Sequence, residues 1–204
     1  TVMAIRIEYM RQAYGVKRVA IVDTDCHHGD GTQDIYWHDP DTLFISIHQD
    51  GRTLYPGSGF LSEMGGPNAI GSTVNIPLPP NTAEDGILHA IREVVLPILE
   101  EFKPDLVINS AGQDNHYSDP ITNMNFSAQG YAELTRLLKP DIAVLEGGYA
   151  IEGALPFLNV RSLQSASIGS VRLLASGHFT KICIAAASTG ATPARKPMPS
   201  SSGR

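Results

Sequence analysis

The sequence has little of what marks secreted, membrane-spanning or disordered proteins. Its two cysteines, Cys26 and Cys183, are too few for a disulfide framework. No apolar run approaches the roughly 20 residues that a membrane-spanning helix needs. Residues 1–15 mix charged with apolar positions, which predicts an amphipathic helix and not a secretion signal. Hydrophobic residues make up 42% of the 204 residues, enough for one domain with a core. We expect a cytoplasmic protein.

Acidic residues are absent after Glu152. Residues 1–152 hold 21 acidic and nine basic residues, a formal charge of −12, whereas residues 153–204 hold six basic residues and no acid, a charge of +6. An acidic body excludes nucleic-acid binding by the main domain, because phosphate contacts need a basic face. The end of the chain is a different kind of sequence, and we expect the run from Ser188 onward to be disordered.

Strand-like and helical patterns alternate before this change in composition. Short apolar, β-branched runs predict strands at residues 18–23, 42–48, 72–76, 105–110 and 141–145. Helical spacing predicts helices over 1–15, 82–102 and 127–138, the last with Ser127 as its N-cap. Thr82 is the expected N-cap of the long middle helix, which Pro97 should kink. The pattern indicates an α/β fold, a parallel sheet between helices, with ligands beyond the carboxyl ends of the strands.

Carboxylates and imidazoles follow the first predicted strand, in the segment DTDCHHGDG at 23–31. Because alternate residues point the same way, Asp25 and His27 could present an oxygen and a nitrogen to one cation. Asp23 points the same way and could contact these ligands without binding the cation itself, or it could bind a second ion. Crowded carboxylates repel one another unless a cation offsets their charge. The segment alone leaves a second interpretation open, a polar turn with two surface histidines.

Two later segments lie at the same predicted edge of the sheet. Asp114, in SAGQDNH at 110–116, would complete a set of two carboxylates and one imidazole, which leaves a fourth position for water as in catalytic zinc sites. By itself an acid in a Gly-containing loop is more typical of a turn. Tyr149, in EGGY at 146–149, could hold its hydroxyl over the edge, where an oxyanion would develop. By itself it could also pack beneath a loop.

Four segments together resemble the histone deacetylase family, namely DTDCHHGDG, SIHQDGRTLYPGSG, INSAGQDNHYSDP and LEGGY. The likeness is to bacterial and archaeal members, including the acetoin-utilisation and acetylpolyamine deacetylases. It implies an incomplete arginase/deacetylase-like domain over residues 1–160, with part of the sheet absent. Residues 161–204 then form a divergent, partly disordered basic tail. A shifted reading frame or an assembly artefact would produce such a break, and a genuine tail is the alternative.

The resemblance also implies roles for single residues. Asp25, His27 and Asp114 resemble the ligands of a zinc ion, and Tyr149 resembles the tyrosine that polarises the acetyl carbonyl.

Other family positions concern a second ion and the substrate. Asp23 and Ser46 resemble residues that hold a monovalent cation, for which potassium is the candidate. Tyr55 stands where many members have a phenylalanine lining the tunnel for the acyl-lysine side chain, and Gly148 is expected in the same tunnel.

The activity implied by the resemblance is zinc-dependent hydrolysis of an acetyl amide, in an acetyl-lysine protein or an acetylated small amine. In the family a histidine pair in an upstream Gly-rich segment does the acid–base work. No segment of this sequence matches it, so we expect this chain to turn over poorly. Two alternatives stay open: an arginase-type ureohydrolase with two manganese ions, which needs more bridging aspartates, and an inactive truncated relic. The sequence does not indicate the oligomeric state.

Overall fold

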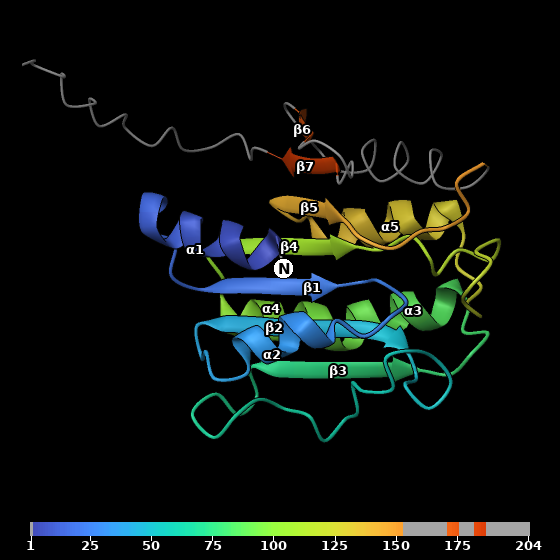
Figure 1. Ribbon diagram of the computed structural model, residues 1–204, viewed down its shortest axis with the longest axis horizontal. Coiled ribbons are helices and arrows are strands. Elements are labelled where there is room, and N and C mark those ends of the chain that lie inside the picture. The colour runs from blue at the N-terminus through green and yellow to red at the C-terminus, as the bar shows by residue number, and fades with distance from the viewer. Residues whose placement is uncertain (1, 153–170, 176–181, 187–204) are drawn as a thin grey trace, which may run out of the picture.

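One mixed sheet with helices on both faces forms the centre of the protein (Figure 1). The computed structural model describes residues 2–152, 171–175 and 182–186. Five strands are parallel, as predicted: β1 (Val19–Asp23), β2 (Thr42–Gln49), β3 (Thr73–Leu78), β4 (Leu106–Ala111) and β5 (Ile142–Leu145). Their spatial order is β3-β2-β1-β4-β5, so that β1 lies in the middle of the parallel part.

Two antiparallel strands extend the sheet beyond β5. The strand β7 (Ile182–Ala186) pairs with β5, and β6 (Val171–Ala175) pairs with β7. The sequence analysis did not predict either strand, because both lie in the segment interpreted as a divergent tail. The other residues of that tail, including the run from Ser188, lie outside the described residues, and the division at residue 160 stays a prediction.

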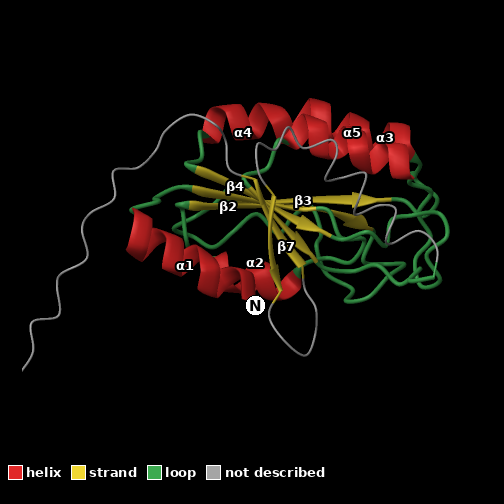
Figure 2. Ribbon diagram, turned by 90° about the horizontal axis from the view of Figure 1, so that it is seen from above, coloured by secondary structure: helices red, strands yellow, loops and turns green. Residues whose placement is uncertain are grey.

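The helices form two layers, one on each face of the sheet (Figure 2). One layer holds α1 (Val2–Tyr14) and α2 (Asp30–Tyr36). The other holds α3 (Glu84–Ala90), a π-helical turn η1 (Ile91–Val95), α4 (Leu96–Phe102) and α5 (Ala128–Leu138). The sequence analysis did not predict α2. No helix among the described residues is long and apolar enough to cross a membrane.

The central strand β1 is buried on both faces, which explains its uninterrupted apolar sequence. Successive side chains of a strand point to opposite faces. Ala20 and Val22 accordingly pack in the core beneath α3, α4 and α5, whereas Val19 and Ile21 pack in the core beneath α1 and α2.

The long middle helix begins later than predicted and has an irregular centre. Ala83, not Thr82, occupies the N-cap position, and no side chain caps it. The Thr82 hydroxyl instead donates to the carbonyl of Pro79 at 2.7 Å. The π-helical turn ends two residues before Pro97. Because proline has no backbone N–H and crowds the preceding turn, a local widening is the expected response.

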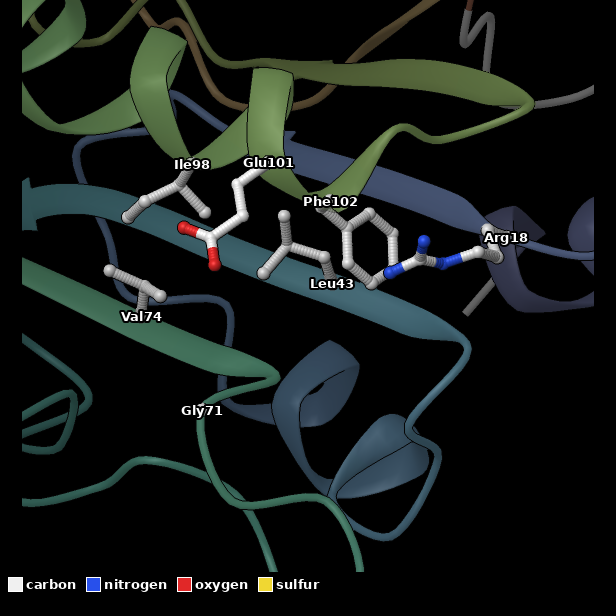
Figure 3. Close-up of a pocket in the computed structure, with 7 residues that line it drawn as sticks. All are labelled: Arg18, Leu43, Gly71, Val74, Ile98, Glu101 and Phe102. Carbon is white, nitrogen blue, oxygen red and sulfur yellow. The ribbon is translucent and has the colours of Figure 1, made fainter.

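A hollow of about 380 Å³ lies at the amino ends of β2 and β3, beside the end of α4 (Figure 3). The guanidinium of Arg18 lies over the ring of Phe102, 4.0 Å from its centroid. Leu43 and Val74 line the same hollow from the sheet, and Glu101 lines it from α4. This hollow is therefore at the opposite end of the strands from the polar segments that the sequence analysis identified.

The cap of α5 provides a test of the predicted helix boundary. The Ser127 hydroxyl accepts a hydrogen bond from the Gly130 amide at 3.0 Å, as predicted. We expect Ser127→Ala to lower the free energy of unfolding by about 1 kcal/mol. Thr82→Ala is the control and should lower it by less than about 0.5 kcal/mol, because Thr82 caps no helix amide. Urea denaturation measures both, and equal losses would contradict the assignment.

Candidate metal centre

The predicted site residues gather at the carboxyl ends of the parallel strands. Asp23, the last residue of β1, pairs in register with Ser46 of β2 and with Ser110 of β4. The loops that follow β1, β4 and β5 therefore leave the sheet side by side. They border a hollow of about 860 Å³ whose lining includes Asp25, His27 and residues from the loop after β5.

Three side chains from two of these loops bring their ligand atoms together. One atom each from Asp25, His27 and Asp114 lies within 4.8 Å of the others. The Nδ1 atom of His27 is 3.1 Å from Asp25 Oδ1 and 2.8 Å from Asp114 Oδ2. Asp114 is fully buried. This is the arrangement predicted from the sequence, and it excludes Asp114 as a mere surface turn residue.

Backbone amides fix the orientation of both carboxylates. Asp25 Oδ1 accepts from the His27 amide at 2.9 Å, and Asp25 Oδ2 accepts from the Gly147 amide at 2.6 Å. Asp114 Oδ1 accepts from the Cys26 amide at 2.8 Å. A Cβ at Gly147 would lie 2.3 Å from Asp114 Oδ2 and 2.5 Å from Asp25 Oδ2. Glycine is therefore required at position 147, where the β5 loop closes over the two aspartates.

Burial and crowding perturb the pKa values of this cluster. The hydrogen bonds to Asp114 and Asp25 raise the pKa of His27 to about 10. Burial raises the pKa of Asp114 to about 6, although its bond to His27 opposes the shift. Burial and the charge of Asp25 hold the pKa of Asp23 well above its ordinary value. The raised pKa values mean that protons offset part of the negative charge of these acids. A divalent cation bound here would displace those protons.

The donor set fits a divalent metal ion. Two carboxylates and one imidazole suit zinc and other first-row metals. Backbone amides already hold both carboxylates with one oxygen of each against His27, so little rearrangement is needed for these oxygens to face one cation. The geometry supports a metal site without indicating which metal it takes.

Tyr149 lies beside the cluster and is half exposed, at 47%. Its ring meets the His27 ring edge-on, with centroids 6.4 Å apart and an angle of 84° between the planes. Its amide donates to Asp119 Oδ2 at 2.8 Å, and Gly148 before it has φ +139°. Burial and the nearby carboxylates of Asp25 and Asp114 raise the pKa of its hydroxyl. A tyrosine packed beneath a loop, the alternative interpretation, does not fit this exposure.

The remaining predicted residues lie around the hollow. Asp23 and Ser46 are buried neighbours in register, but the Ser46 hydroxyl bonds to His48 Nδ1 at 2.9 Å. Their role in holding a monovalent cation stays a prediction. Tyr55 lines the hollow and is 77% exposed, and a cis peptide bond joins it to Pro56.

Two histidines have roles that the sequence analysis missed. His28 and His48 are 4% and 0% exposed, and their ring centroids are 4.9 Å apart. Burial and the neighbouring His28 lower the pKa of His48 to about 4. The interpretation of 23–31 as a turn with two surface histidines is therefore wrong. One signal in the sequence could have revealed the role of His28. In an extended segment successive side chains point to opposite sides, so His28 points away from Asp25 and His27.

Comparison with known proteins finds relatives that agree with the resemblance seen in the sequence. Residues 2–158 match the sequence profile of the histone deacetylase domain, close to the span of about 2–160 expected from the sequence. The chain is 47% identical over 167 residues to a probable deacetylase of Archaeoglobus fulgidus, which covers 78% of this chain and 46% of that protein. It is 38% identical over 162 residues to the acetoin utilization protein AcuC of Bacillus subtilis, covering 75% and 42%.

A solved structure shares both fold and sequence. The acetylpolyamine aminohydrolase from Burkholderia pseudomallei is 34% identical, with a TM-score of 0.72, over 78% of this chain and 47% of that one. This chain therefore spans less than half the length of each of these three relatives.

The geometry predicts which residue is needed for metal uptake. Asp114→Ala should remove most bound divalent metal, since three ligands leave little redundancy. His116→Ala is the matched control: it lies in the same loop, and its Nδ1 bonds to Ser118 Oγ at 2.8 Å and not to the cluster. Elemental analysis after loading and dialysis measures both. Full metal content in the Asp114 variant would contradict its assignment as a ligand.

Proposed function

The chain belongs to the histone deacetylase family, and we propose on this premise that it forms the metal-binding part of a zinc-dependent deacetylase. The resemblance found in four short segments is thereby confirmed. The observation that carries the proposal is the convergence of Asp25, His27 and the buried Asp114 beside Tyr149, at the edge of a hollow that Asp25, His27 and Tyr149 line. The reaction would be hydrolysis of the acetyl amide of an acetylated amine.

Zinc is the proposed metal because three protein ligands leave a position open, as in catalytic zinc sites. Zinc held by Asp25, His27 and Asp114 would supply a Lewis acid that polarises the amide oxygen and acidifies water. The ureohydrolase alternative is not favoured, because the relatives reported above are named a probable deacetylase, an acetoin utilization protein and an acetylpolyamine aminohydrolase. It would also need ligands for a second ion, and a search of the described residues found this one cluster of three.

Other groups of this chain would orient the metal ligands and stabilise the oxyanion. The amides of Cys26 and Gly147 hold Asp114 and Asp25 with one oxygen each turned to His27. The pKa of Tyr149 is raised, so its hydroxyl stays protonated and can donate a hydrogen bond to the oxyanion that forms from the acetyl carbonyl.

Protonation of the leaving amine needs a further group. The sequence has one adjacent histidine pair, His27-His28. His27 belongs to the metal cluster, and His28 is engaged with Ser58 and Gln33. We therefore propose that the family's upstream histidine pair supplies this proton transfer and that the present chain alone turns over slowly.

The proposed substrate is an acetylated amine with positive charge elsewhere, such as an acetylated polyamine or an acetyl-lysine in a basic protein. Four acidic residues line the hollow, namely Asp23 at the end of β1, Asp25 and Asp30 from the segment after it, and Glu146 after β5. Among the described residues no lysine or arginine lines it. An acidic cleft concentrates cationic substrates. Tyr55 would supply an aromatic wall of the substrate tunnel, and Asp23 with Ser46 would hold a potassium ion.

The test compares two zinc-loaded proteins, this chain and the same chain joined to the upstream segment of the Archaeoglobus fulgidus relative. Acetate release from an acetyl-lysine peptide and from an acetylated polyamine is measured. We expect the joined protein to be faster by about 10²–10⁴-fold, the usual contribution of a positioned acid–base group. Equal turnover would overturn the role of the upstream pair. No turnover from a zinc-loaded joined protein would favour the inactive relic.

Tyr149→Phe in the joined protein tests the oxyanion donor. Loss of one such donor typically lowers turnover by about 10²–10³-fold, and zinc content should stay unchanged because the hydroxyl is not a ligand. Tyr117→Phe is the matched control, an exposed tyrosine that does not line the hollow. A loss smaller than about tenfold for Tyr149→Phe would assign this tyrosine a packing role.

A further inference from the structure

A long loop after β2 carries the proposed substrate wall. This loop, residues 50–64, is called the Tyr55 loop here. Tyr55 projects from it beside the metal hollow. The second half of the loop lies on the rings of two buried histidines, His28 and His48, which come from the ends of β1 and β2.

His48 is held as one neutral tautomer. Its Nε2 lies 3.0 Å from the carbonyl oxygen of Gly59. A carbonyl can only accept, so Nε2 carries the proton and donates. Its Nδ1 must then accept from the Ser46 hydroxyl at 2.9 Å. Both ring nitrogens are satisfied, and one of the two bonds holds the Tyr55 loop.

His28 is also held at both ring nitrogens. Its Nε2 lies 3.1 Å from Gln33 Oε1, which already accepts from Asn75 Nδ2 at 2.8 Å. Nε2 therefore donates to Gln33, and Nδ1 bonds to the Ser58 hydroxyl at 2.8 Å. His28, which follows the proposed ligand His27 in the chain, is therefore hydrogen-bonded to Ser58 of the Tyr55 loop.

The backbone of the loop at Gly59 lies close against both rings. Gly59 has φ +83°, and a Cβ there would lie 2.4 Å from His48 Nε2 and 2.7 Å from the ring of His28. Glu63 holds the same turn, because its carboxylate accepts from the amides of Gly59 at 3.2 Å and Phe60 at 3.0 Å. Gln33 Nε2 donates to Glu63 Oε2 at 2.7 Å and joins the two sets of bonds.

We propose that His28 and His48 are positioning residues that fix the Tyr55 loop, and with it the substrate wall, on the segment that holds the metal. The part of this proposal that concerns substrate rests on the proposed function. The part that concerns the loop does not. Removing a ring nitrogen leaves buried polar groups of the loop without a partner, and local opening of the loop then becomes easier. Tyr55 would lose its defined place beside the hollow.

Hydrogen exchange of the Gly59 and Phe60 amides in the zinc-loaded chain tests the loop. His48→Leu should speed their exchange by about tenfold, because it removes the donor to Gly59. His48→Gln retains a side-chain N–H donor and should restore most of the protection. His89→Leu is the control on the exposed face of α3 and should leave exchange unchanged. Zinc content should be equal in all of them.

If the His48→Leu protein does not fold or does not bind zinc, the Ser58→Ala variant tests the anchoring of the Tyr55 loop instead. It removes only the partner of His28 Nδ1 and should speed exchange of the same two amides by a few fold. Wild-type exchange in a folded His48→Leu protein would overturn the proposal. If that variant does not fold, wild-type exchange in Ser58→Ala would overturn it.

A kinetic measurement separates the loop from the substrate role. In the joined protein, His48→Leu should raise KM for the acetyl-lysine peptide by about tenfold with kcat much less affected, as expected for lost substrate binding. Faster exchange with an unchanged KM would overturn the role of the histidines in placing Tyr55. Failure of the joined protein to deacetylate would contradict the proposed function, and the exchange experiment would still test the anchoring of the loop.

Discussion

The repulsion among three buried carboxylates is the constraint on which the rest of this structure depends. Asp23, Asp25 and Asp114 are buried close to one another and to the imidazole of His27 at the carboxyl ends of the strands. Charges of one sign in such a place are stable only if protons, amide dipoles or a cation offset them. Amides of His27, Cys26 and Gly147 supply part of this compensation. The parallel register brings the strand ends that carry these acids to one edge, and Gly147 leaves room for the two carboxylates beside it.

The sequence predicted the parallel sheet and the metal cluster because both follow from simple periodicities. Strands buried on both faces are continuous apolar runs, as in Val19–Asp23, and parallel strands bring their carboxyl ends to one edge. Asp25 and His27 alternate on one strand end, and Asp114 follows the strand that pairs with it. Their convergence was therefore predictable from the order of the elements, before any contact was known.

Other features depend on contacts between distant segments, and the sequence could not reveal them. The helix α2 has seven residues and no side-chain cap, so neither a helical period nor a start signal marks it. Thr82 has the residue type of a cap, but its hydroxyl bonds to Pro79. The roles of His28 and His48 arise only when residues 50–64 fold back over the strand ends. No local pattern encodes that return.

The bond from the Gly147 amide to Asp25 would give a metal ion bound at this cluster a part in folding. Gly147 follows β5 closely, its carbonyl accepts from the Gln113 amide at 2.9 Å, and its amide binds the same carboxylate that faces His27. Occupancy of the metal site and docking of β5 are thus linked equilibria, each favouring the other by the same free energy. The concentration of the metal that the site binds would then act on the docking of β5, and a chelator would loosen the β5 side of the parallel strands before the β3 side.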